Sequence, residues 1–292
     1  MTRWQLAHGR HLDLGAKSLL MGILNVTPDS FSDGGEFDRP ERALQQARRM
    51  IGEGAAIIDV GGESTRPGAG AVSAREEQLR ILPVIEALSS EGGSLVSVDT
   101  YRAETARLAV AAGAHIVNDV HGLQREPGIA HVAAETGAGL VIMHTGRGRE
   151  KLADVIADQF LFLDRSLEIA RDAGIADERI VLDPGFAFAK DGEENLALMA
   201  RFGELRGLGF PLLVGTSRKR LARHLVGEID EGRDVGTAAT SVILRLKGAS
   251  IFRVHNVAVN RDALAFADAV RERETGEERA RQAGSVTTPI RR

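Results

Sequence analysis

The sequence predicts a single α/β domain folded as a (β/α)8, or TIM, barrel. Eight short apolar runs alternate along the chain with longer stretches whose apolar residues recur at helical spacing. The apolar runs do not alternate between apolar and polar residues, which is typical of parallel strands buried on both faces. A chain of 292 residues has the usual length for eight such strand–helix units. A doubly wound open sheet is the alternative that the same pattern allows.

The expected elements follow one another in a regular order. Strands are predicted at residues 19–25, 55–61, 94–99, 115–120, 139–144, 179–183, 211–215 and 249–255. Helices are predicted at residues 40–54, 73–88, 101–112, 129–136, 150–173, 193–208, 218–225, 235–247 and 256–271. Residues 1–18 are expected to form a cap or hairpin, residues 19–272 the barrel, and residues 273–292 a disordered tail, because that last segment is polar and aperiodic.

Local signals support several of these boundaries. Pro40 suits the first turn of a helix. Ser73 and Glu76 have the spacing of a capping box at the start of the second helix. Gly113 and Gly174 follow predicted helices at positions where glycine commonly ends them.

The composition limits the possible functions. A formal net charge of −4 argues against general nucleic-acid binding, so an anionic substrate would need a local cluster of Arg and Lys. The absence of Cys excludes disulfides, thiolate metal sites and a cysteine nucleophile. The sequence opens with no basic and apolar leader, and no apolar run approaches the length of a membrane span. A soluble cytoplasmic protein is therefore expected.

Polar residues follow nearly every predicted strand. In this fold the carboxyl ends of the strands meet at one rim, which carries the active site, so these residues are expected to lie together. The polar residues at these strand ends are Asn25, Asp59, Asp99, Asn118, Asp119, His144, Asp183, Ser217, Arg218, Lys219, Arg253 and His255. The apolar Met143 lies at the same level. Taken singly, Asp59 or Asp119 is well explained as a helix N-cap, and a histidine at a strand end as a structural residue. Capping does not require Lys, Arg, Asp and Asn at one rim, so the whole set indicates a binding site.

The rim residues divide by chemistry. Asp99, Asn118 and Asp183 are short acceptors and amides on rigid strands, suited to the hydrogen-bonding edge of a flat heterocycle. A second set is cationic, or can become so, and suits a phosphate or pyrophosphate; it comprises Arg66, Lys219, Arg253 and His255. Asn25, with an Asp from the loop that follows, offers oxygen ligands for Mg²⁺. The sequence carries no zinc-hydrolase, serine-hydrolase or P-loop motif.

These residues stand in segments that resemble a known family, the dihydropteroate synthases. The resemblance extends over nearly all of residues 19–264, with one segment at each strand end. The segments are MGILNVTPDSFSDGG (21–35), IIDVGGESTRPGA (57–69), SVDTYRAE (97–104), IVNDV (116–120), VIMH (141–144), LDPGFAFAK (182–190), VGTSRKR (214–220) and FRVHNV (252–257). Any one piece is weak, but the ordered set is very specific.

The resemblance implies an enzyme of folate biosynthesis, commonly a homodimer, that uses Mg²⁺. It joins 6-hydroxymethyl-7,8-dihydropterin pyrophosphate to p-aminobenzoate and releases pyrophosphate. The implied pterin-binding residues are Asp99, Asn118, Met143, Asp183 and Lys219. Thr65, Arg66, Arg253 and His255 are implied to bind the pyrophosphate, Asn25 the metal, and Phe31, Pro67, Phe188 and Ser217 the p-aminobenzoate. The residues expected to act in catalysis are Asp33, Asp99, Lys219, Arg253 and His255.

The loop at residues 185–190 departs from the family pattern, because Ala187 and Ala189 stand where glycines are expected. Alanine disfavours a positive φ, so this loop is expected to be stiffer, which bears on loop dynamics and sulfonamide response. Two other interpretations remain. One is a methyltetrahydrofolate-dependent corrinoid methyltransferase, which would not need the anion site. The other is a pterin-binding, synthase-like paralogue without coupling activity.

Overall fold

The computed structural model describes residues 2–27, 39–63, 70, 72–219 and 230–284. Eight of its strands lie close to where the sequence predicts them. They are β3 (Leu19–Asn25), β4 (Ile57–Gly61), β5 (Leu95–Asp99), β6 (Ile116–Asp119), β7 (Gly139–Met143), β8 (Ile180–Asp183), β9 (Leu213–Val214) and β10 (Ile251–Val254).

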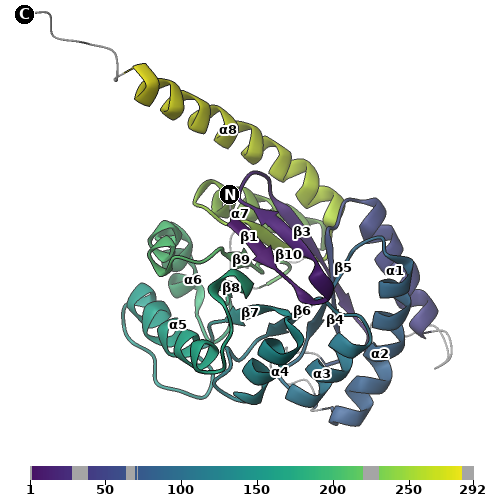
Figure 1. Cartoon of the computed structure of the whole chain (residues 1–292). Helices are drawn as coiled ribbons and strands as arrows, with labels where there is room; N and C mark the ends of the chain where they lie inside the picture. The colour runs from purple at the N-terminus through teal and green to yellow at the C-terminus, as the bar shows by residue number, and fades with distance from the viewer. Residues whose placement is uncertain (1, 28–38, 64–69, 71, 220–229, 285–292) are drawn as a thin grey trace, which may run out of the picture.

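These strands close into a barrel. They form one parallel sheet in the order β8-β7-β6-β5-β4-β3-β10-β9. A further parallel bridge between Leu182 and Leu212 joins β8 to the residue before β9, so the two edges of the sheet meet. Helices surround the sheet on its outside (Figure 1). The predicted (β/α)8 barrel is therefore confirmed.

Several of the surrounding helices begin at a residue whose side chain caps them. The surrounding helices are α1 (Arg39–Gly52), α2 (Ala74–Glu91), α3 (Ala103–Ala111), α4 (Gly128–Thr136), α5 (Val155–Asp172), α6 (Gly192–Ala200), α7 (Asp230–Leu246) and α8 (Val257–Gly284). Ser73 caps α2 by accepting from the Glu76 amide, whereas the Glu76 side chain pairs with Arg80 and does not complete the predicted capping box. The side chains of Asp154 and Asp191 likewise accept backbone amides and cap α5 and α6. The Asp154 cap makes α5 begin at Val155 rather than at residue 150.

Two helix predictions differ from the structure. The helix expected at residues 193–208 is divided into α6 and a 3-10 segment, Phe202–Leu208. The helix expected at 218–225 does not begin at residue 218, because Arg218 lies in a turn with a φ of 54°, and residues 220–225 lie outside the described residues. None of the described helices combines the length and apolar character needed to cross a membrane.

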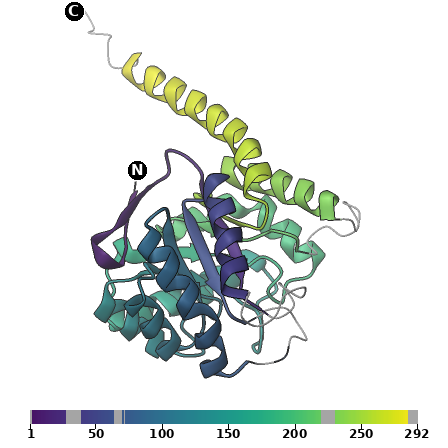
Figure 2. The same ribbon diagram turned by 90° about the vertical axis from the view of Figure 1, so that its right-hand side faces the viewer.

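An N-terminal segment closes one end of the barrel. The lowest layer of the barrel interior is apolar and takes one residue from each strand: Met21, Ile57, Leu95, Ile116, Val141, Val181, Leu213 and Ile251. Trp4, Leu6 and Leu14 pack onto this layer. They come from a hairpin in which β1 (Thr2–Gln5) pairs antiparallel with β2 (His11–Leu14), drawn in purple in Figures 1 and 2. The Trp4 indole is buried and donates to the Arg179 carbonyl at 2.9 Å.

The C-terminal segment differs from the prediction of a disordered tail. Helix α8 runs from Val257 to Gly284, and its last turns project away from the barrel (Figures 1 and 2). Residues 273–284 are thus helical, while residues 285–292 lie outside the described residues. The reason lies in the composition. This stretch contains no proline and consists mostly of Glu, Arg, Ala and Gln, which favour helix even without an apolar face.

Candidate active site

The two-residue period of the strands places the rim side chains. Alternate residues of a strand point to the same face. Counting on by two from the apolar layer gives the next inward positions, which are Ile23, Asp59, Ser97, Asn118, Met143, Asp183, Gly215 and Arg253. The inward positions after these include Asn25, Gly61, Asp99 and His255. The interior of the barrel therefore changes from apolar to polar within one or two steps along each strand.

Arg253 lies between two carboxylates at this polar level. Its Nε donates to Asp59 Oδ2 and its Nη2 to Asp99 Oδ2, both at 2.6 Å. Asn118 Nδ2 donates to the same Asp59 oxygen at 3.1 Å. Burial disfavours the charge of Arg253, but Asp59 and Asp99 outweigh it and raise the pKa of the guanidinium. One network thus joins β10, β4, β5 and β6.

Two buried polar atoms in this network remain available. Asp59 Oδ1 and Ser97 Oγ have no hydrogen-bond partner in the part of the chain that the structure describes. Asp59 and Ser97 are fully buried and lie beside each other in the register of β4 and β5. A bound ligand or an ordered water normally satisfies such atoms.

Burial brings the titration of the rim groups toward neutral pH. It raises the pKa of Asp99 to about 7, although Arg253 opposes the rise. Burial likewise raises the pKa of Asp183, against the effect of Lys219. It lowers the pKa of Lys219 to about 8, although Asp183 stabilises the ammonium. Groups perturbed in this way by burial and by one another are typical of functional sites.

Lys219 and Phe188 form the other side of the site. Lys219 Nζ donates to the Phe186 carbonyl at 2.8 Å and lies 4.5 Å from the centre of the Phe188 ring. Phe188 packs with Val120 and Met143 in a small apolar cluster. The residues predicted to contact the pterin and the p-aminobenzoate are therefore neighbours at the rim.

Ser217 and His255 are joined directly. Ser217 Oγ lies 2.9 Å from His255 Nδ1 and accepts from the His255 amide at 3.1 Å. Ser217 is buried in the turn after β9, and His255 follows β10. This pair places a hydroxyl and an imidazole beside the strand that carries Arg253.

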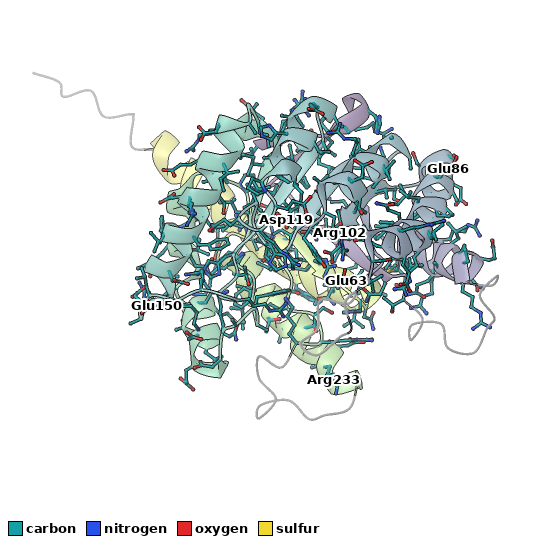
Figure 3. All side chains as sticks on the ribbon, turned by 90° about the horizontal axis from the view of Figure 1, so that it is seen from below. Glu63, Glu86, Arg102, Asp119, Glu150 and Arg233 are labelled. Atoms are coloured by element: carbon teal, nitrogen blue, oxygen red, sulfur yellow. The ribbon has the colours of Figure 1, made fainter. Side chains whose placement is uncertain are left out.

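Arg102 holds both ends of the connection between β4 and α2. Its Nη1 donates to Glu63 at 2.7 Å and to Glu77 at 2.8 Å, and its Nη2 donates to the Val72 carbonyl at 2.6 Å. Figure 3 shows Arg102 and Glu63 next to each other near the middle of the molecule, seen from below. The guanidinium therefore fixes the points from which residues 64–71 begin and end.

The structure describes ten of the fifteen predicted site residues, and all ten lie at the carboxyl end of the barrel. They are Asn25, Asp99, Asn118, Met143, Asp183, Phe188, Ser217, Lys219, Arg253 and His255. The other five, Phe31, Asp33, Thr65, Arg66 and Pro67, lie outside the described residues. The roles of individual residues toward substrates stay predictions.

Three strand-end residues differ in role from one another. Asp59 is not a helix cap, because it is buried inside the barrel. Counting by two from Ile57 would have identified it as an inward-facing residue of its strand. Asp119, at an outward position, accepts from the His121 and Leu123 amides and so closes the turn after β6. His144 also points outward from the barrel, is fully buried and lies 3.0 Å from Asp158. Its role is therefore structural, which is the alternative given above for a histidine at a strand end.

Comparison with known proteins gives a consistent result. Residues 21–255 match the family described as pterin binding enzyme. The dihydropteroate synthase of Bacillus subtilis is 48% identical over 241 residues, which cover 82% of this chain and 84% of that protein. The solved structure of Xanthomonas albilineans dihydropteroate synthase with 4-aminobenzoic acid has a TM-score of 0.86 at 42% identity, covering 92% of this chain and 99% of that chain. The same enzyme in complex with 7,8-dihydropteroate has a TM-score of 0.83 at 40% identity, covering 91% and 98%. The chain therefore belongs to the dihydropteroate synthase family of pterin-binding enzymes, which are transferases.

Proposed function

We propose that this enzyme joins 6-hydroxymethyl-7,8-dihydropterin pyrophosphate to p-aminobenzoate, forming 7,8-dihydropteroate and pyrophosphate. The observation that carries the proposal is the meeting of strand-borne acceptors, Asp99 and Asp183, with the cations Lys219 and Arg253. Such a rim suits a flat heterocycle that is covalently attached to an anion. The pterin pyrophosphate is a substrate of this kind.

The pterin ring would be held by groups on rigid strands. Asp183 accepts from ring N–H groups, Asn118 offers both a donor and an acceptor, and Lys219 donates through its ammonium. Asp59 holds the Asn118 amide in place and at the same time holds Arg253. A single carboxylate thereby fixes the distance between the pterin half and the pyrophosphate half of the site.

The reaction would proceed by an SN1-like displacement. The bond between the pterin methylene and the pyrophosphate oxygen lengthens first, while Arg253 and His255 stabilise the charge that develops on the leaving group. The Asp99 carboxylate stabilises the cationic methylene. The aniline nitrogen then forms the new C–N bond, and the resulting anilinium releases its proton to water. Because the aniline is a weak neutral nucleophile, its placement beside Phe188 and Ser217 matters more than its activation.

Asn25 and Asp99 fit a magnesium ion that is shared with the substrate. A Cβ atom on Gly61 would lie 3.9 Å from Asn25 Oδ1 and 3.7 Å from Asp99 Oδ2, so the two oxygens face the same glycine. No group of three or more His, Asp or Glu in the described residues forms a metal site by itself. Mg²⁺ commonly takes one or two protein oxygens together with substrate phosphates. When bound, it would neutralise charge on the pyrophosphate.

We also propose that the enzyme is a homodimer through α7 and α8. Among the described residues, six of the nine exposed large apolar side chains lie on these two helices: Val235, Ile243, Leu246, Val259, Phe266 and Val270. An exposed apolar surface of this kind commonly marks a protein interface. Sedimentation of wild type and of Phe266→Asp tests this. A dimer that dissociates in the variant is expected, and a monomeric wild type would refute it.

The proposed reaction is tested by pyrophosphate release. The purified enzyme is incubated with the pterin pyrophosphate and Mg²⁺, with and without p-aminobenzoate. Release that depends on p-aminobenzoate, with 7,8-dihydropteroate formed in equal amount, is the expected result. A protein that binds the pterin pyrophosphate but releases nothing when the aniline is added would instead be the non-coupling paralogue, which the curated relatives do not favour.

A further inference from the structure

Lys190 is a buried lysine at the end of the loop after β8, and no step of the proposed reaction uses it. Only 8% of its surface is exposed. Its Nζ donates to the Gly185 carbonyl at 2.8 Å and lies 2.9 Å from His144 Nδ1. A lysine is rarely buried to this extent unless its charge is paired or its donors are used. Its contacts therefore indicate what the ammonium does.

His144 connects Lys190 to helix α5. His144 Nδ1 lies 2.9 Å from Lys190 Nζ. His144 Nε2 lies 3.0 Å from Asp158 Oδ2 and 2.9 Å from Arg149 Nη2. Burial lowers the pKa of His144 to about 4, so the imidazole is neutral. Arg149 donates to both Asp158 oxygens, at 2.8 and 2.6 Å. Lys190 is thus the inner end of a hydrogen-bonded chain anchored on a helix.

The Lys190 ammonium also closes its own loop into a ring, by returning to Gly185. Within the ring, the Phe188 amide donates to the Gly185 carbonyl at 3.1 Å. The Phe186 carbonyl accepts from Lys219 Nζ, and the Phe188 ring lies against the same ammonium. Both contacts of Lys219 with this loop therefore depend on the shape that Lys190 maintains.

The backbone of this loop is under strain and pressed against β7. Gly185 has a φ of 62°, and a Cβ atom there would lie 1.9 Å from the His144 carbonyl oxygen. Ala187 and Ala189 have φ values of 65° and 53°, in the left-handed region that disfavours alanine. A loop with two such alanines requires compensating contacts to keep its conformation. The Lys190 ammonium supplies one of them from inside the ring, at the Gly185 carbonyl. Others come from Lys151 to the Ala189 carbonyl, from Gly146 to the Phe188 carbonyl and from the Ala187 amide to Asn195.

On the basis of the function proposed above, we propose that Lys190 is a positioning residue for the second substrate. Its ammonium fixes the loop of residues 185–190, so that Phe188 lines the p-aminobenzoate pocket and the Phe186 carbonyl orients Lys219. The residue acts through Phe186 and Phe188 and touches neither substrate.

The test compares Lys190→Met with wild type and with a matched control, Lys247→Met, whose ammonium binds the Ala200 carbonyl at the surface. Lys190→Met is expected to raise KM for p-aminobenzoate at least about tenfold. The dissociation constant of the pterin pyrophosphate, measured without p-aminobenzoate, should rise by a smaller factor than this KM, since Asp99 and Asn118 make no contact with Lys190, whereas Lys219 and Asp183 lie near it. Tm should fall slightly, because the variant removes a buried charge but leaves His144 Nδ1 and the Gly185 carbonyl without this donor. Lys247→Met should resemble wild type throughout.

Chemical rescue provides a second readout, because it shows whether returning an ammonium to this position is enough to restore KM. The chain contains no cysteine, so Lys190→Cys introduces a single thiol. Treatment with 2-bromoethylamine in denaturant, followed by refolding, converts that thiol into an analogue of the lysine side chain. The unmodified cysteine variant is expected to show the raised KM, and aminoethylation to lower it again. Wild type carried through the same steps controls for refolding.

An unchanged KM for p-aminobenzoate in Lys190→Met and Lys190→Cys would overturn the proposal. An equal loss of pterin affinity together with a large fall in Tm would also overturn it, because that is the behaviour of a lysine needed only for folding. A wild-type enzyme that releases no pyrophosphate would refute the proposed function instead. In that case the affinity for p-aminobenzoate in the presence of the pterin pyrophosphate still tests Lys190.

Discussion

The two ends of the barrel are built on the same strands and have opposite chemistry. At the amino end, one apolar residue from each strand packs beneath Trp4, Leu6 and Leu14. Two residues further along β4 and β10, the interior holds an ion pair between Asp59, which is fully buried, and Arg253, whose side chain is 18% exposed. The first arrangement gains stability from apolar burial, whereas buried charges contribute little or cost stability unless they are fully paired. The barrel therefore separates stability from chemistry along its axis.

The largest expected effect is at the polar end. Lys219→Ala and Asp99→Ala should each lower kcat/KM by at least about 10³-fold, because each removes a charged group that the proposed reaction uses. The fold should persist, since neither residue contributes to the apolar layer. Steady-state kinetics and circular dichroism measure the two effects. Turnover similar to wild type in either variant would remove that residue from the site.

The second prediction concerns the apolar end. Trp4→Ala should lower the free energy of unfolding by about 3–5 kcal/mol, the usual cost of truncating a large buried side chain. It also leaves the Arg179 carbonyl without its indole donor. The folded fraction should keep kcat/KM close to wild type. Urea denaturation and kinetics at a temperature well below Tm check both parts, and a large loss of kcat/KM would show that the two ends are coupled.

The third prediction is a pH dependence at the polar end. Lys219 carries its proton below about pH 8, the value to which burial lowers its pKa. As the pH rises through this value the donor is lost, so kcat/KM should fall by about tenfold per pH unit above it. Lys219→Arg keeps its charge to far higher pH and should move this alkaline limb upward, even if it lowers the maximum rate. An unchanged limb in the arginine variant would assign the titration to another group.

The contrast between the ends also explains what the sequence could predict. Strand positions and rim residues such as Asn118 and Asp183 were predictable from local sequence. The apolar run indicates the strand, and the polar residue that ends it indicates the rim position. The pairing of Arg253 with Asp59 was not, since it joins residues 194 positions apart and follows from barrel closure. Lys190 and Asp158 likewise meet through His144 only once α5 has packed against β7. The pattern of one segment cannot report contacts that depend on closure and packing.

The smallest expected effect concerns the two strained alanines of the rim. Replacing alanine by glycine normally destabilises a protein by about 0.5–1 kcal/mol, because glycine has more freedom in the unfolded chain. Ala187 and Ala189 already occupy left-handed backbone, which costs alanine about 1–2 kcal/mol. Each Ala→Gly change should therefore leave the free energy of unfolding unchanged or raise it by up to about 1 kcal/mol.

The matched control is Ala157→Gly, at an exposed position in the first turn of α5, which should lose about 0.5–1 kcal/mol. KM for p-aminobenzoate should stay within about threefold of wild type in the loop variants, because Lys190, Lys151 and Gly146 hold this loop through backbone carbonyls that the substitutions keep. Urea denaturation and steady-state kinetics measure the two quantities. A rise in KM on changing both alanines, with stability unchanged, would mean that alanine itself keeps the loop in place. The strain would then be part of the site rather than a cost that its hydrogen bonds offset.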